Sequence, residues 1–104
     1  MRTRLENRRP NERIEFEHDG QLCTALVGFR ADGFEPAEVF IEGGKIGSSF
    51  HAAARDGGLL LSIAMQHGID LRVFQLSVTR LDDGRAAGVI GAAIDAVIKA
   101  YGGQ

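Results

Sequence analysis

The sequence predicts an α+β domain in which a three-stranded antiparallel meander is followed by three helices packed on one sheet face (β-β-β-α-α-α). In the first half of the chain apolar and polar residues alternate, which is the period of half-buried strands. Asp19-Gly20 and Asp32-Gly33 separate the apolar runs, and such pairs are typical of tight turns. Beyond residue 43 the apolar spacing changes to that of amphipathic helices.

The predicted strands cover residues 14–17, 21–30 and 37–42. The second strand has two distinct faces. One face carries Leu22, Thr24 and Leu26, and the other carries Cys23, Ala25, Val27 and Phe29. Short turns between consecutive strands indicate antiparallel pairing.

The first predicted helix covers residues 50–67, with Ser48 or Ser49 as its N-cap and Gly68 as its stop. The predicted buried stripe consists of Phe50, Ala53, Gly57, Leu60, Leu61 and Ala64. The predicted polar stripe consists of His51, Arg55, Ser62 and Gln66. Gly57-Gly58 lowers helix propensity, so we expect the helix backbone to pack closely there, against the sheet. Further helices are predicted at residues 71–79, capped by Asp70, and at residues 89–101.

Length and composition predict one domain. The chain has 104 residues, of which 1–12 are predicted to be a flexible Arg-rich arm and 13–104 a single domain. The formal net charge of −2 gives no general attraction to nucleic acid or to an anionic membrane. No apolar run approaches the length of a membrane span, and no apolar secretory segment follows Met1, so a cytoplasmic location is expected.

The loop at residues 43–49 is the candidate ligand site. Its glycines allow a ligand to approach the backbone, and the helix start that follows offers free N–H groups and partial positive charge. Lys45 adds a full positive charge, so the loop predicts phosphate or anion binding, although its spacing is not that of a Walker A loop. The predicted ligand-binding residues are Gly44, Lys45, Gly47, Ser48, Ser49 and Arg55. The alternative interpretation is a serine-capped turn with Lys45 in solvent.

No arrangement of residues predicts catalysis, a metal site or a cofactor. The three histidines do not form a metal cluster on this helix and strand pattern. Cys23, the only cysteine, cannot form an internal disulfide and is expected to be a small buried apolar residue. Asp82 and Asp83 lie beside Gly84, as in a solvated turn. The chain is therefore not expected to be a self-sufficient enzyme.

Several short motifs point to one family. They are Val39-Phe40-Ile41, Gly44-Lys45, Gly47-Ser48, Gly84-Arg85, and the segments at residues 61–68 and 91–95. With them the chain resembles the TSCPD domain, which occurs at the C-terminal end of adenosylcobalamin-dependent ribonucleotide reductases and in small free-standing bacterial proteins. The Thr-Ser-Cys-Pro-Asp string and the cysteine pairs near it are absent here. The resemblance implies an accessory domain connected with ribonucleotide reductase or nucleotide metabolism, without a thiol relay.

Three functions remain open at this point. The first is a non-catalytic accessory or interaction domain, whose partner is a ribonucleotide reductase, another protein or a second copy in a homodimer. The second is a small nucleotide- or phosphate-binding module that uses the loop at residues 43–49. The third is an RNA-binding domain, because the layout is similar to that of the double-stranded-RNA-binding domain. That domain presents a cluster of lysines at the helix start, where this chain has only Lys45, so nucleic acid is the least expected partner.

Overall fold

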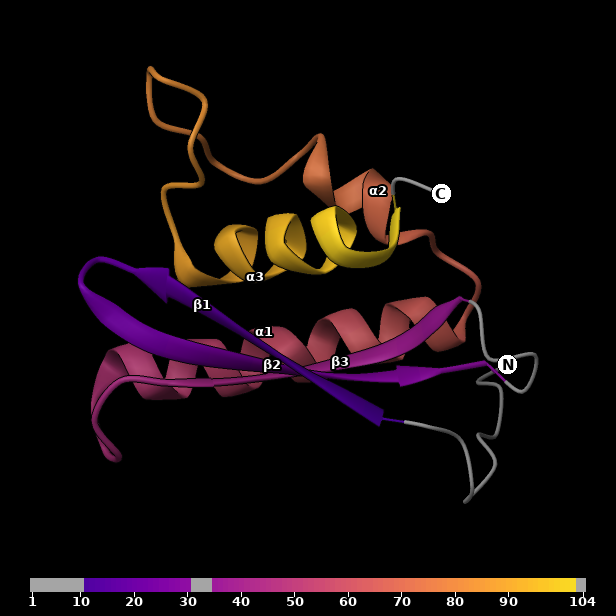
Figure 1. Cartoon of the computed structure of the whole chain (residues 1–104), viewed down its shortest axis with the longest axis horizontal. Coiled ribbons are helices and arrows are strands. Elements are labelled where there is room, and N and C mark those ends of the chain that lie inside the picture. The colour runs from indigo at the N-terminus through magenta and orange to yellow at the C-terminus, as the bar shows by residue number, and fades with distance from the viewer. Residues whose placement is uncertain (1–10, 31–34, 103–104) are drawn as a thin grey trace.

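The computed structural model describes residues 11–30 and 35–102. The strands form one antiparallel sheet and follow the chain in the order β1 (Asn11–His18), β2 (Gln21–Phe29) and β3 (Pro36–Gly43). The helices come next, in the order α1 (Ser49–Gln66), α2 (Leu71–Gln75), α3 (Val89–Val97) and the π-helical turn η1 (Ile98–Gly102). Figure 1 shows α3 against the sheet and η1 as its continuation. The predicted α+β class and the order of the elements are confirmed.

β1 begins earlier than the apolar pattern indicates. Asn11 and Glu12, which the sequence assigned to the arm, pair with Gly28 and Val27 of β2. Backbone pairing along β2, and not apolar alternation, extends the strand to these polar residues. The rest of the predicted arm, residues 1–10, lies outside the described residues. At the other end of β1, Asp19 and Gly20 both have positive φ, 52° and 76°, as a tight hairpin turn requires.

The core lies between the sheet and α3. Alternate residues of β2 face it and are buried, which confirms the predicted faces of this strand: Cys23, Ala25, Val27 and Phe29. Ala93, Ile94 and Val97 of α3 complete the same apolar cluster. On the opposite face of β2, Leu22 is 67% exposed.

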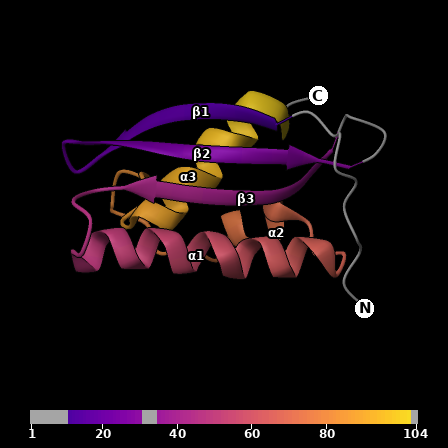
Figure 2. The same cartoon turned by 90° about the horizontal axis from the view of Figure 1, so that it is seen from below.

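The helix α1 runs alongside β3, next to the edge of the sheet (Figure 2). Ser62 is fully buried there. Its Oγ accepts a hydrogen bond from the Val39 N–H at 2.9 Å and donates one to the Val39 carbonyl at 2.7 Å. In the described sheet only β2 pairs with β3, so these two backbone groups of Val39 have no strand partner. One side chain of α1 therefore satisfies both backbone polar groups that Val39 presents at the outer edge of β3.

The predicted faces of α1 were partly wrong. Ser62 and Gln66, which were placed in the polar stripe, are 0% and 3% exposed, whereas Leu60, which was placed in the buried stripe, is 66% exposed. A helical wheel assigns apolar residues to the interior. The edge of a strand instead favours small residues that come close and polar residues that hydrogen-bond to it: Ser62 bonds to the Val39 backbone, and Gln66 Nε2 donates to the Glu38 carboxylate at 3.3 Å.

The two adjacent glycines of α1 face different neighbours. A Cβ atom built at Gly58 would lie 2.8 Å from the backbone nitrogen of Ile41 in β3. A Cβ atom built at Gly57 would lie 2.4 Å from the side chain of Ile90 in α3. The predicted close packing at the glycine pair is confirmed, and it involves both the sheet and α3.

The second helix is shorter than predicted, because α2 ends at Gln75 and not at Thr79. Asp70 is its N-cap, as predicted, and accepts a hydrogen bond from the Arg72 N–H at 2.8 Å. Arg80 Nη2 donates to the Gln75 carbonyl at 2.9 Å, which occupies the acceptor that a continuing helix would use. The third helix also ends early, since α3 gives way to the wider η1 turn at Ile98.

An ion pair joins the segment after α2 to α3. Arg80 binds both carboxylate oxygens of Asp95, with Nη2 2.9 Å from Oδ1, and Gln75 Nε2 donates to the same Oδ1 at 3.2 Å. The hydrogen bond from Arg80, followed by that from Gln75 and the Arg80 charge, lowers the pKa of Asp95 against the opposing effect of burial. Because the pair is partly exposed, its contribution is smaller than that of a buried pair.

We expect Asp95→Asn to reduce the free energy of unfolding at pH 7 by about 1–2 kcal/mol. A carboxylate with a lowered folded-state pKa stabilises the protein above its unfolded pKa of about 3.9, and this stabilisation is lost as the pH falls through the folded value. The difference between wild type and variant should therefore be constant from pH 8 to about pH 5 and shrink below it. Urea unfolding across this pH range checks the prediction, and a constant difference down to about pH 2 contradicts it.

Candidate functional site

The loop that the sequence singled out connects β3 to α1. Ser48 is the N-cap of α1: its Oγ accepts from the His51 N–H at 3.1 Å and donates to the Lys45 carbonyl. Gly44 has a φ of +75°, and a Cβ atom there would lie 2.5 Å from the Phe50 ring. The loop thus needs glycine and serine for its own conformation. Lys45 is exposed, and the part of the chain that the structure describes places no carboxylate in ion-pair contact with it.

The structure brings five of the six predicted site residues together and pairs the sixth elsewhere. Gly44, Lys45, Gly47, Ser48 and Ser49 share the loop and the first residue of α1. Arg55 lies further along α1 and pairs with Glu42 of β3, with Nη1 3.6 Å from Oε2. Both side chains of this pair are more than half exposed, so the charge of Arg55 remains accessible to solvent.

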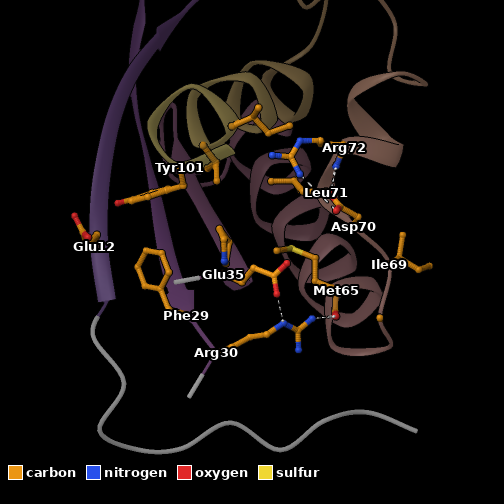
Figure 3. Close-up of a pocket in the computed structure, with 14 residues that line it drawn as sticks. Glu12, Phe29, Arg30, Glu35, Met65, Ile69, Asp70, Leu71, Arg72 and Tyr101 are labelled. Atoms are coloured by element: carbon orange, nitrogen blue, oxygen red, sulfur yellow. Dashed lines mark hydrogen bonds and ion pairs between the residues drawn. The ribbon is translucent and has the colours of Figure 1, made fainter. Parts of the chain in front are cut away.

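A pocket of about 590 Å³ lies at the other end of α1. It is bounded by the ends of β2 and β3, by the connection from α1 to α2, and by α3 with η1. Figure 3 shows Glu12 and Tyr101 at one side of the pocket and Asp70, Leu71 and Arg72 at the other. Its volume lies within the range of small-molecule sites in proteins.

Apolar residues and ion pairs share the pocket wall. Phe29 packs edge-to-face on Tyr101, with ring centroids 5.0 Å apart. Arg30 Nε lies 3.5 Å from Glu35 Oε2, and Arg30 Nη2 donates to the Met65 carbonyl at 3.4 Å. This last contact places a positive charge at the C-terminal end of α1, where the helix dipole favours it.

Tyr101 lies in the π-helical turn η1 and lines the pocket. Burial raises the pKa of its phenol, and hydrogen bonding to the Glu12 carboxylate and the charge of Glu12 raise it further. Neither Tyr101 nor Glu12 was predicted from the sequence to be a site residue. The pocket combines residues from widely separated parts of the chain, and each of them has an ordinary local pattern, so no motif indicates it. Turns of π-helix occur frequently at functional sites, but the sequence predicted a regular helix here.

Other reactive groups are either buried or dispersed. Cys23 is 1% exposed, and burial raises the pKa of its thiol, which disfavours the thiolate. Within residues 11–30 and 35–102, no group of three or more histidine, cysteine, aspartate or glutamate residues is placed to hold a metal ion. Over the same residues, no helix is long and apolar enough to cross a membrane.

The arrangement is that of a small α+β domain with a ligand-sized pocket and an exposed loop at the start of its long helix. Neither a family model nor a solved structure matches the chain. In an alignment of 67 residues that covers 62% of this chain, the chain is 42% identical to a vitamin B12-dependent ribonucleotide reductase of Rhodopirellula baltica. The chain spans 6% of the length of that reductase. It is therefore related to a small segment of a ribonucleotide reductase.

Proposed function

We propose that this chain is a non-catalytic interaction domain related to the TSCPD domain at the C-terminal end of B12-dependent ribonucleotide reductases. The observation that carries the proposal is the 42% identity to a segment of such a reductase. A small segment of a large enzyme suits a supporting role better than an independent reaction. The single buried cysteine supports the same view, because reductase chemistry relies on several thiols.

The proposed partner is a ribonucleotide reductase, and the proposed contact surface is the outer face of α1. Leu59 and Leu60 are 46% and 66% exposed on this face, away from β3 and α3. Exposed leucines at neighbouring positions of a long helix offer the apolar centre that a protein interface requires. Arg55 lies on the same helix and is available as a polar anchor at its border.

We expect the purified chain to bind a purified adenosylcobalamin-dependent ribonucleotide reductase saturably in biolayer interferometry. Leu60→Glu should weaken this binding at least tenfold, because it places a charge in the apolar contact. Leu22→Glu is the matched control, since Leu22 is 67% exposed but lies on the sheet face opposite the core. An absence of binding at about 100 μM, or an equal loss in both variants, contradicts the proposal. Light scattering of the chain alone shows whether it self-associates through the same face, and so distinguishes a homodimer from a complex with the reductase.

A second candidate function is anion binding at the loop at residues 43–49, favoured by the exposed and unpaired charge of Lys45 among the described residues. The ligand would be a nucleotide or inorganic phosphate held by Lys45 and the backbone of Gly44, Gly47, Ser48 and Ser49. Arg55 would add charge only by exchanging its partner Glu42.

For this second candidate we expect Lys45→Ala to weaken binding of ATP, dATP and phosphate about threefold to tenfold, with no change in melting temperature. The melting temperature stays constant because the Lys45 side chain is exposed. Amide NMR titrations measure the affinity at Gly44, Gly47 and Ser48. Lys99→Ala is the control, because it removes an exposed lysine from the other end of the molecule. Equal effects of the two substitutions, or no saturable shifts in the wild type, exclude a site at the loop.

A further inference from the structure

The pocket at the C-terminal end of α1 has a buried apolar interior. Phe29, Met65, Leu71 and Val97 contribute to it, and each of these residues is buried. Apolar walls of this kind favour a ligand whose body is apolar and packs against them.

The charges of the described residues that line the pocket do not cancel. Among the described residues that line it, three carboxylates stand against two guanidinium groups. Arg30 pairs with Glu35 at 3.5 Å, and Arg72 Nη1 lies 3.6 Å from Asp70 Oδ2. Within the same described set, Glu12 is the carboxylate that no cation neutralises.

Among the described residues, the groups beside Glu12 supply no positive charge that would compensate its carboxylate. The Tyr101 phenol next to it is neutral at physiological pH, since its pKa is raised by burial and by Glu12. The last turn of α1 also lies at the pocket, where the Met65 carbonyl accepts a hydrogen bond from Arg30 Nη2. A negatively charged ligand placed beside Glu12 would be repelled by its carboxylate.

We propose that this pocket binds a small organic cation with an apolar body, whose ammonium group contacts the Glu12 carboxylate. The body occupies the space between Phe29, Met65 and Leu71, and the ammonium group lies at the side of the pocket that Glu12 and Tyr101 form (Figure 3). This inference goes beyond the proposed function, because it assigns a ligand class to a site that the reductase similarity does not address.

The test compares three ring compounds of similar shape and different charge: cyclohexylamine, cyclohexanol and cyclohexanecarboxylate. Tyr101 is the only tyrosine and the chain has no tryptophan, so the intrinsic fluorescence of the full chain reports directly on the pocket. None of the probes absorbs at the excitation wavelength. We expect saturable binding of cyclohexylamine, about fivefold weaker binding of cyclohexanol, and the weakest binding for the carboxylate. Amide shifts at Gly68 and Leu71 give a second reading of the same titrations.

Glu12→Gln should remove the preference for the amine, so that cyclohexylamine binds no more tightly than cyclohexanol. Glu15→Gln is the matched control on the same strand, because Glu15 pairs with Thr24 on the opposite sheet face, and it should alter neither affinity. Three results would each overturn the proposal: binding of the carboxylate as tight as that of the amine, a preference for the amine that survives Glu12→Gln, or no saturable response to any probe.

Discussion

Ser62→Ala is expected to lower the free energy of unfolding by about 2–4 kcal/mol, although it removes a single oxygen atom. The Ser62 hydroxyl is the partner of both the N–H and the carbonyl of Val39. Val39 and Ser62 are both buried, so water cannot take the place of the hydroxyl without opening the contact between α1 and β3. Each buried backbone group left without a partner costs about 1–3 kcal/mol.

Urea unfolding followed by circular dichroism measures this loss. Ser77→Ala is the control, because the exposed Ser77 hydroxyl donates to the Val73 carbonyl at 3.0 Å within one helical turn. It should change stability by less than about 0.5 kcal/mol. Hydrogen exchange provides a local reading, since the Val39 amide should lose protection in Ser62→Ala. Equal free energies of unfolding for Ser62→Ala and Ser77→Ala would show that the Ser62 hydroxyl does not stabilise the contact between α1 and β3.

Gly58→Ala should destabilise the domain by about 2 kcal/mol, even though alanine is the better helix former by about 1 kcal/mol. The added methyl group would lie 2.8 Å from the Ile41 nitrogen and 3.2 Å from the Val39 carbonyl oxygen. Backbone atoms of a paired strand cannot rotate away, so α1 has to move off β3 as a whole. The hydrogen bonds of Ser62 to Val39 would weaken at the same time.

Gly57→Ala supplies the comparison for Gly58→Ala, since the three atoms nearest to its methyl group all belong to the Ile90 side chain. Shortening that side chain in the double variant Gly57→Ala, Ile90→Ala should recover part of the loss, which a double-mutant cycle measures as coupling. Adding Ile90→Ala to Gly58→Ala should recover nothing. Recovery in the second pair would contradict close contact between Gly58 and the backbone of β3.

The parts of the fold that the sequence predicted correctly depend on neighbours along the chain. The alternation in β2, the Asp19-Gly20 turn and the caps at Ser48 and Asp70 are local, and each is present in the structure. The faces of α1 depend on what the helix packs against. Nothing near Ser62 indicates that its hydroxyl binds the backbone of Val39, which is 23 residues away.

The two candidate sites, the loop and the pocket, also differ in whether their residues are neighbours along the chain. The loop at residues 43–49 is contiguous, so glycines and a lysine before a helix start made it visible in the sequence. Part of that signal has a structural cause, because Gly44 accommodates the Phe50 ring and Ser48 caps α1. The pocket could not be predicted, because Glu12 and Tyr101 meet only after β1 and η1 are placed beside each other.

Hydrogen exchange with mass spectrometry, of the chain alone and with a purified adenosylcobalamin-dependent ribonucleotide reductase, tests the proposed function most directly. The outer face of α1 is expected to form the contact, so peptides that contain Leu59 and Leu60 should exchange more slowly in the complex. Peptides from β1 and from the turn at Asp19-Gly20 should be unchanged. Unaltered exchange throughout the chain at saturating reductase would contradict an interaction domain for this enzyme, and protection confined to other elements would refute α1 as its contact surface.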